Sequence, residues 1–173
     1  MRGDVVLHLR LLLRGAGLAG VVATLGGGLA IVATRLPWYA ATTTVTMLGA
    51  QDDRVVATMP GIPETGWGWL AGWAGLSAMG LGVGVALDRP LRMARAGLAA
   101  AAVALVAATL GALAWPPELA QVAGSELPAL TGLAGRLPVG VGLDLAVARA
   151  IGPWGALVAA ILVAGGAIGA RDR

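Results

Sequence analysis

Few side chains in this sequence could do acid–base, nucleophilic or metal chemistry. The 173 residues contain no Cys and one His, His8. This excludes thiol redox chemistry, thiolate zinc sites and a His cluster within the chain. His8 stands beside Arg10 in a leucine-rich stretch that predicts an interfacial helix before the first apolar segment. We therefore expect no catalytic residue, no metal site and no cofactor.

Acidic residues are the remaining candidate metal ligands. Those outside the long apolar segments and their basic connections are Asp52, Asp53, Glu64, Glu118, Glu126 and Asp144. Oxygen ligands suit Ca²⁺, but the spacing of a calcium loop is absent. Asp52 and Asp53 are more typical of a hairpin turn, so we interpret these residues as structural.

The glycines from Gly15 to Gly20 match the G-x-G-x-x-G pattern of dinucleotide sites. That mechanism needs an acidic residue about 20 positions later, where this chain has Arg35. We interpret the glycines as helix-packing positions.

Aromatic side chains could bind a ligand, and the sequence has six Trp, one Tyr and no Phe. Most gather near the expected ends of apolar segments: Trp38, Tyr39, Trp67, Trp69 and Trp73. Amphipathic rings favour the headgroup layer of a membrane, so anchoring is the simpler interpretation. The alternative is an apolar pocket or interface that these five residues line.

The elements that carry these residues follow from composition. The chain is 58% hydrophobic and 12% charged, with a mean hydropathy of +0.83. A bilayer core requires about 20 apolar helical residues, and four stretches qualify: 15–34, 67–87, 96–115 and 151–170. The sequence predicts an all-α membrane protein, a single membrane domain with a four-helix transmembrane bundle. A cleaved signal peptide is the alternative for the first stretch.

The distribution of Arg predicts the orientation. All twelve basic residues are Arg, and eight lie in the N-terminal segment, the short second connection and the C-terminus. By the positive-inside rule both termini are cytoplasmic, and loops 35–66 and 116–150 are external. We expect a bacterial plasma membrane, and the Arg-, Ala- and Gly-rich composition suggests a GC-rich genome. The basic character then reflects topology, with no nucleic-acid partner expected.

Both external loops contain strand-forming sequence. Residues 41–47 and 54–59 are rich in Thr and Val and predict a hairpin. Residues 117–133 predict short helices that Pro128 breaks or kinks. Residues 139–147 alternate apolar and small or polar side chains, as a half-buried strand does. A lone hairpin is marginal in water, so this strand should join it in a small extracytoplasmic β-sheet cap.

This order of features is similar to that of the actinobacterial Trp-associated (tryptophan-biosynthesis-associated) membrane proteins. The resemblance rests on Arg35-Leu36-Pro37-Trp38 after the first span, the external hairpin, an Arg-rich turn and Pro153-Trp154 opening the last span. It implies a membrane protein and supplies no catalytic residues. Claudins share the broad tetraspan plan, but this chain lacks their external Cys.

These features favour a non-catalytic accessory or scaffold subunit of a larger membrane complex. Its partners would be membrane lipids and other membrane-protein subunits. Small residues recur four apart in all four spans, and Gly165 with Gly169 is our candidate helix-partner face. The alternative is a protein that binds a lipid- or quinone-type apolar ligand. A small transporter or enzyme component comes third, because no predicted span holds an ionisable side chain.

Overall fold

A computed structural model describes residues 15–47, 49–87 and 93–170. His8 and the predicted interfacial helix lie outside these ranges. In chain order the elements are α2 (Gly15–Arg35), β1 (Pro37–Met47), β2 (Ala50–Pro60), α3 (Gly66–Ala86), α4 (Ala94–Ala114), α5 (Leu119–Ala123), a 3₁₀ turn η1 (Gly124–Glu126), α6 (Leu127–Ala134), β3 (Val141–Arg149) and α7 (Gly152–Gly169).

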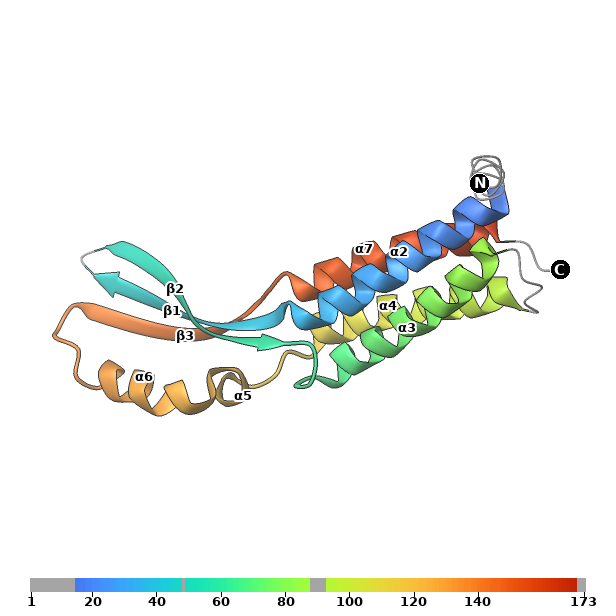
Figure 1. Ribbon diagram of the computed structural model, residues 1–173. Coiled ribbons are helices and arrows are strands. Elements are labelled where there is room, and N and C mark those ends of the chain that lie inside the picture. Colours follow the sequence, from blue (N-terminus) through green and yellow to red (C-terminus); the bar gives the residue numbers. More distant parts are fainter. Residues whose placement is uncertain (1–14, 48, 88–92, 171–173) are drawn as a thin grey trace, which may run out of the picture.

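Four long helices form a bundle, and the sheet with α5 and α6 projects from one of its ends (Figure 1). Helix α2 packs against α3 and α7, and α4 packs against the same two helices. Each of the four is long and apolar enough to cross a membrane. Their bounds agree with the four predicted stretches to within two residues.

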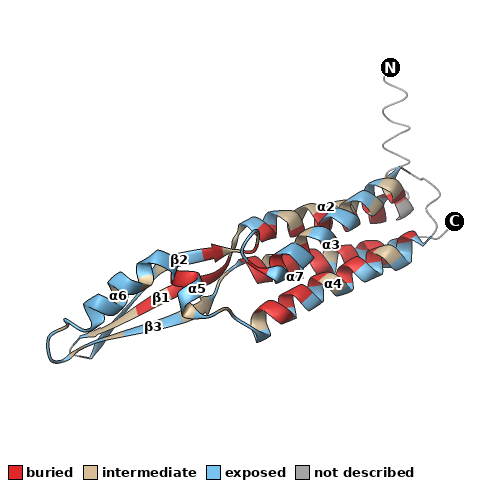
Figure 2. Ribbon diagram, turned by 90° about the horizontal axis from the view of Figure 1, so that it is seen from below, coloured by how far each residue is buried: buried red, intermediate tan, exposed pale blue. Residues whose placement is uncertain are grey.

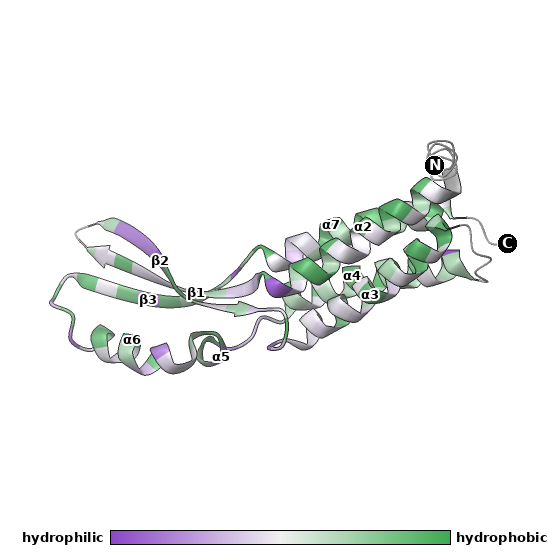
Figure 3. Cartoon of the chain, in the orientation of Figure 1, coloured by the Kyte–Doolittle hydropathy of each residue, from purple (hydrophilic) through white to green (hydrophobic). Residues whose placement is uncertain are grey.

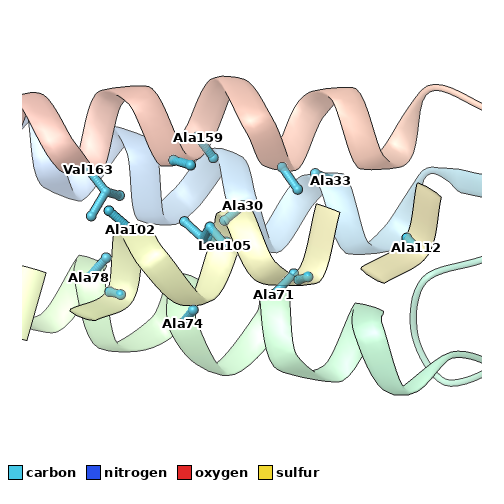
Figure 4. Close-up of a cluster of buried hydrophobic side chains, with 14 of the residues drawn as sticks. Ala30, Ala33, Ala71, Ala74, Ala78, Ala102, Leu105, Ala112, Ala159 and Val163 are labelled. Atoms are coloured by element: carbon cyan, nitrogen blue, oxygen red, sulfur yellow. The ribbon is translucent and has the colours of Figure 1, made fainter. Parts of the chain in front are cut away.

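Small residues set the spacing of the bundle. Its core consists largely of alanines, with a few larger side chains such as Leu105 and Val163 (Figure 4). A Cβ on Gly27 of α2 would lie 2.5 Å from the Gly75 carbonyl oxygen of α3. On the other flank, a Cβ on Gly166 of α7 would lie 2.6 Å from the Ala23 Cβ of α2. Much of the small-residue surface is therefore used for packing inside the monomer.

The sheet is antiparallel with strand order β2-β1-β3. The prediction that the late strand joins the hairpin is confirmed, with Thr43 opposite Leu145. The expected hairpin turn was wrong in one respect. Asp52 and Asp53 lie inside β2, paired with Val45 and Thr44, and the chain reverses next to Gly49, whose φ is 85°. Glycine adopts this conformation without strain, so the reversal is shorter than the run of turn-forming residues suggested.

Helices α5 and α6 run along one side of the sheet (Figure 2). Val122 and Ala123 of α5 are buried, and α5 contacts all three strands. Pro128 occupies the first turn of α6, where its missing N–H is harmless, so it begins a helix instead of breaking one. The apolar residues of β3 from Val141 to Val147 are half-buried, whereas Gly142 and Asp144 are exposed, as the alternation predicted. Val139 is the exception, because it precedes the strand and is fully exposed.

Candidate functional site at the junction of bundle and sheet

The sheet end of α4 carries two carbonyl groups without helical partners. The donors for the Ala112 and Leu113 carbonyls would be the N–H groups four residues later, but those residues are Pro116 and Pro117. The Tyr39 hydroxyl donates to the Ala112 carbonyl oxygen at 2.8 Å. The Arg149 guanidinium donates to the Leu113 carbonyl oxygen at 2.8 and 3.2 Å. Residues of β1 and β3 therefore cap the helix.

The same device closes α2. The residue four positions after Ala33 is Pro37, and the Ala33 carbonyl oxygen accepts from the Leu36 N–H at 3.3 Å and from the Trp38 indole N–H at 2.9 Å. Trp38 is fully buried. A Cβ on Gly61 would lie 2.6 Å from the Trp38 Nε1, and one on Gly152 would overlap its Cδ1. Both glycines are therefore required for the close approach of the indole, which joins α2, the loop after β2 and the start of α7.

Electrostatics at this junction centre on Tyr39. Burial raises the pKa of the Tyr39 phenol above its ordinary value of 10.0, and the positive charge of Arg149 partly opposes the shift. The phenol therefore stays neutral and remains a hydrogen-bond donor through the physiological range.

A groove between α2 and α3 is the first hollow near the junction. It has a volume of about 220 Å³. We call it the α2–α3 groove, and it is lined by Ile31, Thr34, Arg35, Ile62, Trp69, Gly72, Trp73 and Leu76. Trp69 and Trp73 are 46% and 62% exposed, so their rings form an open wall. The lining is almost wholly apolar, with Arg35 as its charged residue and the buried Thr34 beside it.

A second hollow of about 230 Å³ lies between β1, the start of α3 and the end of α4. Trp67 and Trp115 both line it and stack on each other, with ring centroids 6.0 Å apart and planes 20° from parallel. The Trp67 ring also covers Gly111, where a Cβ would lie 2.7 Å from three ring carbons. Tyr39 and Glu64 complete its mixed polar and apolar lining.

The five predicted aromatic residues therefore do not line one pocket. Trp69 and Trp73 line the α2–α3 groove, and Tyr39 and Trp67 line the second hollow. Trp38 lines neither of these two, because its ring fills the space between Gly61 and Gly152.

The predicted helix-partner pair is also divided. Gly165 is exposed, and a Cβ there would meet no atom within 4 Å. A Cβ on Gly169 would lie 2.7 Å from the Ala19 Cβ of α2. Both glycines are exposed, but a side chain has room only at Gly165, so the pair does not form one open face.

Arg35 and Arg149 are the site residues that the sequence analysis missed. Arg149 was not singled out, and Arg35 was named only where the dinucleotide pattern needs an acidic residue and in the Arg-Leu-Pro-Trp element after the first span. The signal for Arg149 was present in Pro116-Pro117, which leaves two helix-end carbonyls in need of donors. No comparable sequence signal identified the groove that Arg35 enters.

Across the described ranges, no group of three or more His, Asp or Glu side chains is arranged to hold a metal ion. The fold and the junction define a four-helix protein with a small sheet locked to the helix ends. No protein-family model matches the chain. A search of curated proteins likewise found no matching sequence.

Proposed function

We propose that this is a four-span membrane protein of the bacterial plasma membrane that acts as an accessory or scaffold subunit of a larger complex. In this proposal the helices cross the bilayer, and the sheet with α5 and α6 forms a cap outside the cell. The relation to the Trp-associated family belongs to the same proposal, on the strength of the order of spans, hairpin and Pro-Trp elements.

The observation that carries the proposal is the far end of the cap. Met47 is 54% exposed, Leu133 is 56% exposed and Val139 is fully exposed. These residues lie where β1 ends, where α6 ends and just before β3 begins, away from the bundle (Figure 3). In the proposed topology they face water at the same end of the cap, where exposed apolar side chains favour a contact with another protein.

Removing this apolar surface tests the subunit role. Leu133→Ser with Val139→Ser should leave the protein folded, because both side chains are exposed, but should abolish co-purification of its partners in mild detergent. Val55→Ser is the matched control, since Val55 is 62% exposed in β2 but lies nearer the middle of the sheet. Unchanged co-purification in the double variant, or equal loss in the control, would contradict docking at the cap end.

A second docking surface can be tested on α7. Gly165→Leu should be accommodated in the monomer because the position is open, whereas Gly169→Leu should destabilise it against α2. Loss of partners with Gly165→Leu alone would assign that part of α7 to the complex. Retention of partners with a folded variant would restrict docking to the cap.

The orientation has its own test, which the absence of native Cys makes clean. Single cysteines at Asp52 and at Glu126 should react with an impermeant thiol reagent in intact cells. A cysteine at Arg92 should react only after the cells are opened. Labelling of Arg92→Cys alone in intact cells would reverse the proposed topology.

The α2–α3 groove favours a second function, the binding of an apolar ligand such as a lipid or quinone. Its volume of about 220 Å³ is below the range of about 300–1,000 Å³ typical of sites for drug-sized ligands, so it would hold only an apolar segment of a larger ligand. Its lining is apolar with a single charged group. This function is compatible with a subunit role, because a bound ligand and a protein partner would occupy different surfaces.

A further inference from the structure

We propose that the α2–α3 groove binds the acyl chain of an anionic phospholipid whose phosphate rests on Arg35. The inference rests on the proposed membrane insertion and specifies the ligand of the second proposed function. The observation behind it is that the groove has a charged residue at one end and apolar side chains along the rest of its length.

The charged end is Arg35, the last residue of α2. The other polar groups of the lining are already engaged. The Thr34 hydroxyl donates to the Ile31 carbonyl oxygen at 2.7 Å, and the Trp69 indole N–H donates to the Pro63 carbonyl oxygen at 3.3 Å. Within the described ranges no acidic side chain pairs with Arg35. Its guanidinium is therefore the group that can offer donors to a ligand, and its fork matches phosphate oxygens.

The apolar part extends from this end along the bundle. Seven residues separate Trp69 from Leu76 on α3, which corresponds to about 10 Å along a helix axis. One leaflet of a bilayer has a hydrocarbon depth of about 15 Å. The groove therefore matches most of one leaflet, with Arg35 at the headgroup level and Leu76 toward the midplane.

This polarity selects the occupant. A quinone offers a neutral head that gains little from a guanidinium, whereas a phospholipid presents a phosphate above its chain. A lipid with net negative charge gains most, because a zwitterionic headgroup carries its own cation beside the phosphate. The occupant is thus a phospholipid of the phosphatidylglycerol type.

Quenching of Trp fluorescence by brominated lipids tests the site. The protein is placed in bilayers that contain equal fractions of phosphatidylglycerol and phosphatidylcholine, with bromine on the chains of one or the other. Bromine quenches the rings it touches, and Trp69 and Trp73 line the groove. We expect a preference of about fivefold for phosphatidylglycerol, the effect of one Arg at an anionic surface.

Two variants should abolish this preference, and one should not. Arg35→Gln removes the charge. Gly72→Leu keeps Arg35 but fills the groove; its new Cβ approaches the end of the flexible Ile62 side chain at 2.9 Å and makes an ordinary contact with the Thr34 methyl at 3.7 Å. Arg136→Gln is the matched control, because Arg136 is an exposed Arg beyond the end of α6. Arg35→Lys, which keeps the charge, should retain most of the preference and shows that the site still folds.

The outcomes separate this inference from the membrane proposal. Equal quenching by the two lipids, or a preference that survives Arg35→Gln, overturns the lipid site alone. A lipid preference in the quenching that persists in the Trp69→Phe, Trp73→Phe double variant also overturns the lipid site, since the quenched rings then lie elsewhere. Loss of the preference on adding inorganic phosphate would assign Arg35 to a free anion. If neither lipid quenches, the protein is outside the bilayer and both proposals fail.

Discussion

Replacing Tyr39 by Phe removes one hydroxyl and tests whether the sheet caps the bundle energetically. The ring volume is kept, so the change acts on the 2.8 Å hydrogen bond to the Ala112 carbonyl oxygen. That carbonyl has no backbone donor four residues later, because the residue there is Pro116. A buried acceptor left unsatisfied costs about 1–3 kcal/mol. We expect Tyr39→Phe to lower the free energy of unfolding by about 2 kcal/mol, within that range.

Thr109→Val is the matched control, because it also removes a buried hydroxyl that donates to carbonyl groups. The Thr109 hydroxyl bonds to the Leu105 and Pro153 carbonyl oxygens at 3.0 and 3.3 Å. Both carbonyls lie in helices, where a backbone N–H four residues later serves the same oxygen. No acceptor is orphaned, so the loss should be about 0.5 kcal/mol or less.

The free energies are measured by unfolding in mixed detergent micelles, followed by Trp fluorescence. The two variants should differ clearly in the free energy of unfolding that they lose. If Tyr39→Phe is as stable as the parent, water reaches the Ala112 carbonyl and the junction is not sealed. If Thr109→Val costs as much as Tyr39→Phe, the proline-exposed carbonyl has no special importance.

Three further predictions concern the junction and the sheet. Gly152→Ala should destabilise the protein by about 3 kcal/mol, because its Cβ overlaps the buried indole of β1. Gly165→Ala, at an open position inside α7, should be neutral or stabilising by up to about 1 kcal/mol in the same melt, and equal effects of the two variants would contradict the packing described. Tyr39 is the sole tyrosine, so phenolate absorbance should show it ionising above pH 10 in the folded protein and near 10.0 when unfolded. The free energy of unfolding should be unaffected by Tyr39 below pH 10 and should fall as the pH rises from there toward the higher folded pKa, since the unfolded state then releases its proton first. A folded-state midpoint at or below 10.0 would refute the burial argument. In β3, Val141→Asp should lower the melting temperature more than Gly142→Ser, because the two residues lie on opposite faces of the sheet, and equal tolerance would contradict the observed register.

The four helices could be predicted because length and apolar composition alone define them. The joining of the late strand to the hairpin was also predictable, since alternation and the instability of a lone hairpin both required it. The position of the hairpin turn was not, because the pairing of Asp53 with Thr44, including a 2.7 Å hydrogen bond from the Thr44 hydroxyl, overrides the turn preference of aspartate.

The aromatic residues show where local reasoning stops. Trp38 and Trp69 have similar settings in the sequence, at the ends of apolar segments. One is fully buried and the other is 46% exposed. The difference depends on Gly61 and Gly152, which lie far apart in the chain and make room for the Trp38 ring only once the fold has formed. Division of the predicted pocket into two hollows follows from the same long-range packing.

The strand order has a consequence for how the protein is made. The central strand β1 pairs with β2 almost as soon as both are synthesised, but its other edge waits for β3. Thr42 and its hydrogen-bonded partner Ala146 are 104 residues apart. At a synthesis rate of about 5–20 residues per second, the edge of β1 stays open for about 5–20 s. During that interval the nascent chain presents an unpaired strand rich in threonine, a template for wrong pairing. Production of this protein is therefore most exposed to misassembly between the emergence of β1 and that of β3.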